Sequence, residues 1–255
     1  MSKLAHFLLG LRPAPLASAV AAVCGLNRRR LVRADHGTFL INPISDFGSA
    51  ILKGEYEPQM RSVLSRYLSP GGVFIDLGAN EGYFSVLASH LVGPKGTVIA
   101  IEPQSRLQNV FQTNLAVNEC YNVRLIRCAV CDRTGTAQLS LAPSTNTGAS
   151  SLFRSTRYAL PTEEIRSLCL GDLLDRTGVE HCDLMKVDIE GAEYDVFMAA
   201  ADVLKKGVLK NIALEIHSSI LESRGLSADE LHKYIVENGY ELNSELGPWV
   251  YSFGG

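Results

Sequence analysis

The sequence predicts an α/β fold in which a mostly parallel sheet is covered by helices on both faces. From residue 73 onward, short apolar runs typical of strands alternate with segments of helical periodicity. The second of these strands, Thr97–Ile101, is continuously apolar after its first residue, as expected for a strand buried on both faces. Such alternation requires right-handed crossovers and places ligands at the carboxyl ends of the strands, where the strand order reverses.

Composition and charge restrict the function classes. The chain has 255 residues, 46% hydrophobic and 20% charged, which suits a soluble globular protein with one main domain. Its net charge of -3 gives no positive field for a polyanion, so we expect no nucleic-acid partner. The six cysteines lack the spacing of a disulfide framework, which favours a reducing compartment. Arg12, Pro13 and Pro15 interrupt the apolar N-terminal stretch, so we expect no transmembrane span and a cytoplasmic location.

The pattern divides the chain near the turn at Ser69–Gly72. Residues 1–70 carry helical and short-strand signals without regular alternation, and we expect them to form an extension that packs on the core. Residues 71–255 are expected to form the ligand-binding domain. Its expected strands are 73–76, 97–101, 123–130, 137–141, 166–170, 183–188 and 211–217, followed by a hairpin of 240–242 and 249–251. Its expected helices are 83–91, 104–117, 172–176, 192–204 and one that runs from a capping box at Ser227 to Val236.

Residues 143–160 are rich in Ser and Thr and show no periodicity. They predict a surface loop, and a loop of this length is placed to cover a site.

The segment from Asp76 to Gly82 predicts a nucleotide-type loop, because it ends a strand, opens a helix and carries glycines at Gly78 and Gly82. It lacks the G-x-G-x-x-G spacing that admits a pyrophosphate and the G-x-x-x-x-G-K-[ST] of a phosphate loop. Asp76 suits a ligand with an ammonium group, and Glu102 at the next strand end suits a ribose diol. Together they indicate a nucleoside with an amino-acid portion and no diphosphate.

The same residues also have plainer explanations. The two glycines are compatible with a simple turn, Asp76 with a helix cap, and Glu102 with a solvated loop acid. Their joint position at consecutive strand ends favours the ligand site.

Four stretches of the chain, spread over residues 46–220, resemble the FkbM family of S-adenosylmethionine-dependent methyltransferases. They are Val73–Ser85 with its D-x-G-A-N-x-G-x-[FY] loop, Ile101–Pro103, the K-x-D-x-E-G-x-E of Lys186–Glu193, and Leu214–His217. Asp46–Gly48 and Gly54–Pro58 also look like the family's opening segment. The resemblance implies a seven-stranded Rossmann-like sheet with residues 71–255 as the cofactor-binding domain. It also implies O-methylation of a hydroxyl on a sugar, polyketide or other small molecule.

The resemblance and the strand ends together give candidate roles. Methyl transfer from a sulfonium is an in-line displacement, so the protein must align the acceptor oxygen, exclude water and accept one proton. Asp188 is the first candidate to orient or deprotonate the acceptor, and Glu190 and His217 are the others. A divalent ion such as Mg²⁺, held by Asp188 and a second acid, is an alternative.

Further roles are implied by the resemblance alone: Asn80, Gly82 and Tyr83 contact or enclose the cofactor, and Asp132 approaches the adenine amino group. For two other acids we expect structural roles: Glu193 on the surface of a helix, and Glu215 in an ion pair with a lysine such as Lys186.

Competing functions remain at this level. An NAD-dependent oxidoreductase would share the fold and Glu102, although the middle glycine of its fingerprint is missing. A catalytically inactive methyltransferase-like binding module is the second alternative. The expected partner is a small-molecule or glycan acceptor, whose identity has no readable code, and the oligomeric state stays open.

Overall fold

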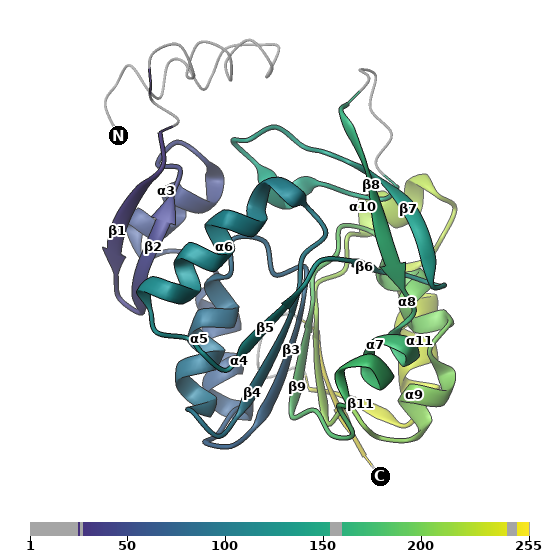
Figure 1. The fold of residues 1–255 in the computed structure, drawn as a ribbon. Helices are drawn as coiled ribbons and strands as arrows, with labels where there is room; N and C mark the ends of the chain where they lie inside the picture. The colour runs from purple at the N-terminus through teal and green to yellow at the C-terminus, as the bar shows by residue number, and fades with distance from the viewer. Residues whose placement is uncertain (1–24, 26–27, 154–159, 244–248, 255) are drawn as a thin grey trace.

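The computed structural model describes residues 25, 28–153, 160–243 and 249–254. A seven-stranded sheet with the order β11-β12-β10-β9-β3-β4-β5 forms its centre (Figure 1). Its strands are β3 (Val73–Leu77), β4 (Thr97–Ile101), β5 (Val123–Ile126), β9 (Leu184–Val187), β10 (Asn211–Leu214), β11 (Tyr240–Asn243) and β12 (Val250–Phe253). Only β12 runs against the other six, so the predicted mostly parallel, Rossmann-like sheet is confirmed.

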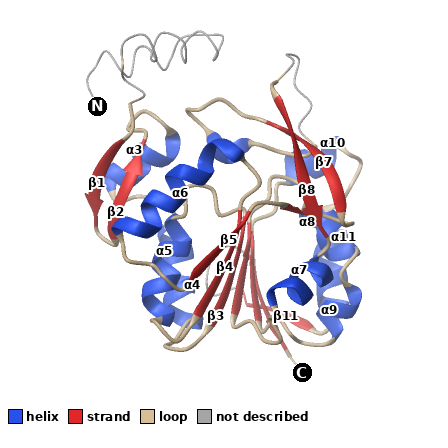
Figure 2. Ribbon diagram, viewed as in Figure 1, coloured by secondary structure: helices blue, strands red, loops and turns tan. Residues whose placement is uncertain are grey.

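Helices cover both faces of this sheet, as the alternation predicted (Figure 2). They are α3 (Asp46–Lys53), α4 (Pro58–Tyr67), α5 (Tyr83–Val92), α6 (Ser105–Val117), α7 (Leu170–Thr177), α8 (Glu193–Met198), α9 (Ala201–Lys205), α10 (Ser218–Ser223) and α11 (Ala228–Glu237). Alternate residues of β3 separate the two cores: Phe74 packs with α4, α5 and α6, and Ile75 packs with α7, α8, α9 and α11. The N-cap of the predicted capping box is confirmed, since Ser227 Oγ accepts hydrogen bonds from the backbone at the start of α11.

The strand order reverses between β3 and β9. From β3 the chain builds outward through β4 and β5 on one side, and through β9 and β10 on the other. Asp76 pairs with Lys186 in the register of these two strands. Their carboxyl ends therefore lie side by side, where an open α/β sheet binds its ligands.

The expected third strand, 123–130, is wrong as a single strand. The central strand β5 ends at Ile126, and Ala129–Val130 form β6 in a separate three-stranded sheet. This sheet also contains β7 (Gly135–Ser140) and β8 (Thr162–Leu168), and it stands over the end of the main sheet (Figure 1). The backbone leaves the central sheet between Ile126 and Ala129 because Ala129 and Val130 pair with β8 instead.

The described part of the N-terminal region contains a hairpin, β1 (Arg30–Ala34) and β2 (Gly37–Ile41), followed by α3 and α4. Two asparagines accept hydrogen bonds from the hairpin backbone: Asn114 of α6 from Leu40 N, and Asn118, which caps the end of α6, from Thr38 N. The hairpin, α3 and α4 share one hydrophobic core with β3 and α5. They pack on the core in this way, whereas the division into two domains at residue 70 stays a prediction. Within the described ranges, no helix has the length and apolarity needed to cross a bilayer.

Candidate functional site

The loop after β3 packs directly against the loop after β9. Gly78 has φ 82°, and a Cβ at this position would lie 1.8 Å from the carbonyl oxygen of Asp188. Glycine is the one residue without a Cβ, so it permits this close approach as well as the left-handed backbone. This contact and the pairing of β3 with β9 place the strand ends at Asp76 and Asp188 side by side.

Glu102, at the end of β4, is buried next to this loop. Its carboxylate accepts hydrogen bonds from Asn80 N at 2.9 Å and from Gln104 N at 2.8 Å. Burial raises the pKa of Glu102 to about 7, against the lowering effect of these two backbone donors. The side chain is thus fixed at the pocket wall and is not the solvated loop acid of the plainer reading.

Asp76 lies beneath the loop and is 1% exposed. Its Oδ2 accepts a 2.6 Å hydrogen bond from Ser85 Oγ, while Oδ1 is buried without a partner among the described residues. Burial raises the pKa of Asp76, and the nearby Lys186 opposes this effect. A buried carboxylate oxygen without a donor is costly, so this atom calls for a ligand or a bound water.

A pocket lies over the ends of β3, β4 and β9. Of the predicted residues, Gly78, Asn80, Tyr83, Glu102, Asp188 and Glu190 line it. Four aromatic side chains form one wall: Phe47, Tyr56, Tyr83 and Phe84. Asp76, Gly82 and His217 do not line it directly, and Gly82 instead shapes the turn with φ 87°.

The Ser- and Thr-rich segment contributes the roof of this pocket. Thr147 Oγ1 donates to Asn80 Oδ1 at 3.1 Å, and Gln104 Nε2 donates to Thr147 O at 3.1 Å. Ser150 Oγ adds a 3.0 Å hydrogen bond to Gln104 Oε1. Gly148, Ser150 and nearby Leu152 line the pocket, so the part of the loop before residue 154 covers the site; residues 154–159 lie outside the described part.

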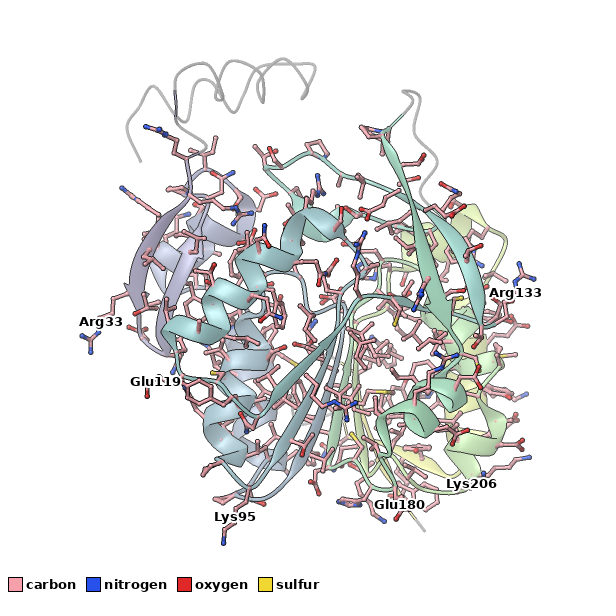
Figure 3. The ribbon with its side chains drawn as sticks, in the orientation of Figure 1. Arg33, Lys95, Glu119, Arg133, Glu180 and Lys206 are labelled. Atoms are coloured by element: carbon pink, nitrogen blue, oxygen red, sulfur yellow. The ribbon has the colours of Figure 1, made fainter. Side chains whose placement is uncertain are left out.

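Asp132 lies away from this pocket. It follows β6 in the small sheet, its side chain is exposed, and it lines a different surface hollow. Its neighbour Arg133 points outward from the edge of the molecule (Figure 3). Asp132 lies away from the pocket for the same reason that the expected strand 123–130 is divided. The chain leaves the central sheet after Ile126 and joins the small sheet before it reaches Asp132. The pocket wall at this end is instead apolar, with Cys128, Ala129 and Val130.

A second group of charged side chains gathers beyond β9. Lys186 Nζ contacts Asp188 Oδ2 at 2.8 Å. His217 Nε2 lies 3.8 Å from Asp188 Oδ1 and 3.7 Å from Glu190 Oε2, and its Nδ1 lies 2.8 Å from Glu193 Oε1. The three candidate catalytic residues therefore meet at one point, although they come from two different strand ends.

The electrostatics of this group follow from buried carboxylates. Burial alone would lower the pKa of His217, but the hydrogen bond to Glu193 and the charges of Glu190 and Asp188 outweigh it and raise that pKa to about 9. Burial would likewise lower the pKa of Lys186, yet Asp188 and Asp76 raise it. Both cations are held charged by their acidic neighbours.

Two expectations about this group are wrong. Glu193 is not a surface helix residue: it is 0% exposed, and its Oε1 accepts from Gly191 N and from Ile189 N as well as contacting His217. Helical periodicity does not indicate that the side chain of Glu193, the first residue of α8, accepts hydrogen bonds from the backbone of the preceding loop. Lys186 makes its ion pair with Asp188, not with Glu215, because both side chains leave the same end of β9.

No specific role was predicted for Tyr56 or Glu57, which precede α4. Tyr56 lines the pocket, and Glu57, Asp188 and Glu215 bring carboxylate oxygens within 4.8 Å of one another. Burial, and then the charges of Asp188 and Glu215 acting against Lys186, raise the pKa of Glu57. Glu57 has a positive φ of 38°, and its side chain makes no hydrogen bond that caps α4. Strained backbone of this kind is common at functional sites.

Comparison with known proteins identifies the family. The model of the methyltransferase FkbM domain matches residues 76–242, which is more than half of the chain. The methyltransferase sdnD of Sordaria araneosa is 25% identical over 211 residues, covering 71% of this chain and 78% of its own. The 2-O-methyltransferase NoeI of Sinorhizobium fredii is 25% identical over 162 residues, covering 57% of this chain and 64% of its own.

Among solved structures, the precorrin-6y C5,15-methyltransferase of Geobacter metallireducens GS-15 aligns with a TM-score of 0.45 and 16% identity, covering 77% of this chain and 87% of that one. The family match spans the loop after β3, Glu102, and the group formed by Asp188, Glu190 and His217. The chain therefore belongs to the FkbM family of S-adenosylmethionine-dependent methyltransferases.

Proposed function

We propose that this methyltransferase transfers the methyl group of S-adenosylmethionine to a hydroxyl oxygen of a sugar or another small molecule. The observation that carries the proposal is the junction of β3 and β9, where a nucleoside-type pocket meets a group of proton-accepting side chains. The similarity to a 2-O-methyltransferase supports oxygen as the acceptor atom.

The residues of the pocket fit each part of this cofactor. Glu102 offers its carboxylate to the ribose hydroxyls, and the apolar wall at Cys128–Val130 suits the adenine ring. The unpartnered Oδ1 of Asp76 suits the amino group of the methionine part, directly or through a water. Asn80 and Tyr83 enclose the cofactor from the loop side.

The chemical step then needs alignment and one proton acceptor. The acceptor oxygen attacks the methyl carbon, the carbon–sulfur bond breaks with its electron pair moving to sulfur, and the hydroxyl proton leaves. Asp188 orients the hydroxyl and receives this proton, since it lies at the pocket wall with Oδ2 anchored by Lys186. Glu190 lies next to it and contacts the acceptor, and His217 supports both carboxylates.

Two other functions fit less well. The pocket has no second glycine of a dinucleotide fingerprint and no place built for a pyrophosphate along Asp76–Gly82, which disfavours an NAD-dependent oxidoreductase. A catalytically inactive module has no need to keep the buried Lys186 beside the partly buried Asp188 and His217, since burial of the Lys186 charge costs folding free energy.

The acceptor proposal is tested by transfer of a labelled methyl group to a panel of sugars, glycosides and small alcohols. We expect label in an ether, which survives alkaline hydrolysis. Asp188→Asn should lower the rate by about 100-fold or more, while Asp175→Asn, an exposed residue of α7, should leave it unchanged. Label found in alkali-labile esters or on nitrogen, or full activity of Asp188→Asn, would contradict the proposal.

A further inference from the structure

We propose that Asp188, Glu190 and His217 form a binding site for one divalent cation that accepts mixed oxygen and nitrogen ligands, such as Mn²⁺ or Zn²⁺. The inference rests on the proposed function for its chemical meaning, because the ion would lie at the acceptor end of the cofactor pocket. There it would act as a Lewis acid toward the acceptor oxygen, in addition to the alignment supplied by the protein.

The spacing of the three ligand atoms suits such an ion. Asp188, Glu190 and His217 each offer one donor atom, and these atoms lie within 4.8 Å of one another. The imidazole Nε2 is 3.8 Å from Asp188 Oδ1 and 3.7 Å from Glu190 Oε2. Ligand atoms about 2.1 Å from one ion lie roughly 3.0–3.4 Å apart, so small side-chain rotations would close the site. A mixed imidazole and carboxylate set favours transition-type ions over Ca²⁺.

The imidazole of His217 is held in the orientation that a metal ligand needs. Glu193 Oε1 lies 2.8 Å from Nδ1, so Nδ1 carries a hydrogen and points away from the ion, leaving Nε2 toward the two carboxylates. Histidines that bind metals almost always donate their other ring N–H to a carboxylate or carbonyl in this way. Glu193 is fully buried and lies outside the three ligands, and its Oε1 holds this ring as well as the backbone amides of Ile189 and Gly191.

The carboxylate ligands are also held from behind. Lys186 Nζ contacts Asp188 Oδ2 and leaves Oδ1 on the side of the imidazole. Glu190 has the left-handed φ of 52°, and Ser151 Oγ donates to its carbonyl oxygen at 2.5 Å, so the roof segment fixes its backbone. A strained backbone held by neighbouring structure is typical of a residue whose side-chain direction matters.

The charge balance leaves room for a further cation. Six carboxylates gather here against the two cations Lys186 and His217; they are Glu57, Asp76, Asp188, Glu190, Glu193 and Glu215. The sulfonium of the cofactor adds one positive charge. A divalent ion brings two positive charges and displaces one proton from His217 Nε2, so its binding would offset one further negative charge of this group.

The test is a titration of the full-length protein, stripped with EDTA, with MnCl₂, followed by the electron paramagnetic resonance signal of free Mn²⁺. We expect saturable binding of one ion per chain. Asp188→Asn and His217→Gln should each weaken binding by at least about tenfold, and Glu193→Gln, which orients the ring without being one of the three ligands, by about tenfold. The matched control is Glu222→Gln, an exposed acid on the helix that follows His217, which should bind Mn²⁺ as the parent does.

Binding of S-adenosylhomocysteine to the same samples separates this inference from the proposed function. If the nucleoside binds but no saturable Mn²⁺ site exists, or if the site survives in Asp188→Asn and His217→Gln, the cation site is wrong and the cofactor assignment stands. If Mn²⁺ binds as expected but S-adenosylhomocysteine does not, the proposed function fails and the cation site stands. Retained nucleoside binding and an unchanged melting temperature in His217→Gln show that the variant is folded.

Discussion

At the scale of single residues, the site depends on a backbone contact that only glycine permits. Gly78 and Gly71 have similar positive φ angles, 82° and 88°. A Cβ on Gly78 would meet the carbonyl oxygen of Asp188, whereas a Cβ on Gly71 would meet no atom within 4 Å. Alanine substitutions at Gly71 and Gly78 therefore distinguish two contributions to the loss of stability: the strain of a left-handed alanine, which both share, and the separation of the two loops, which only Gly78→Ala requires.

We expect Gly71→Ala to lower the free energy of unfolding by about 1 kcal/mol through backbone strain alone. Gly78→Ala should lower it by at least about 3 kcal/mol and abolish binding of S-adenosylhomocysteine, because β3 and β9 must separate at their ends. Urea denaturation and a binding titration measure both effects. Equal costs for the two variants would show that the contact between the loops is unimportant.

Glu102 gives the site a predictable response to pH. Ribose hydroxyls donate hydrogen bonds to a carboxylate, so the charged form of Glu102 binds the nucleoside, and the pKa of about 7 in the free protein leaves this form incomplete at neutral pH. Affinity for S-adenosylhomocysteine should therefore rise with pH through this value and level off above about pH 8. We expect roughly a tenfold gain between pH 6 and 7.5.

Calorimetric titration at several pH values measures this dependence. Glu102→Gln should bind more weakly at every pH and show a flat profile in the same range. A parent protein whose affinity does not change between pH 6 and 8 would rule out the assigned role of this carboxylate.

At the scale of elements, one ion pair ties the N-terminal segment to the cofactor loop. Arg29 makes two hydrogen bonds to Glu81, at 2.7 and 2.8 Å, and Glu81 is 1% exposed. Asn114 of α6 donates to Glu81 O at 2.7 Å from the other side. The segment before β1 thus helps to hold the loop that follows β3, on which we propose that the cofactor binds.

We expect Arg29→Ala to lower the free energy of unfolding by about 2 kcal/mol and to weaken binding of S-adenosylhomocysteine, because it leaves the buried Glu81 charge unpaired. Adding Glu81→Gln should recover part of the stability. Arg28→Ala, an exposed neighbour, is the control and should have little effect. Chemical denaturation of the parent, Arg29→Ala, Glu81→Gln and the double variant gives the coupling, and losses of stability that simply add in the double variant would show that the pair contributes nothing.

Element boundaries show which parts of the fold the sequence could predict. Strands β3 and β4 and helices α5 and α6 lie within about two residues of the predicted ranges, because each is bounded by a turn or a cap. The split of 123–130 into β5 and β6 was not predictable from an apolar run, since hydrophobicity does not say which sheet a strand joins. The position of Asp132 outside the pocket follows from the same split.

At the scale of the whole molecule, the topology determines most of the site. The pairing of β3 with β9 brings Gly78 to Asp188, although more than a hundred residues separate them. Residues at strand ends, such as Glu102 and Asp188, were therefore predictable once the fold class was known. Glu57 and Glu193 were not, because their positions depend on how a helix from the N-terminal region and a buried helix start pack onto those strand ends.

The most direct test of the central claim is calorimetric titration of S-adenosylhomocysteine and, separately, of NAD into the purified protein, with Asp76→Ala and Glu102→Ala. We predict one S-adenosylhomocysteine per chain, no measurable binding of NAD, and a loss of at least about tenfold in affinity for each variant. Binding of NAD in preference to S-adenosylhomocysteine, or unchanged nucleoside affinity in both variants, would contradict the account of this pocket.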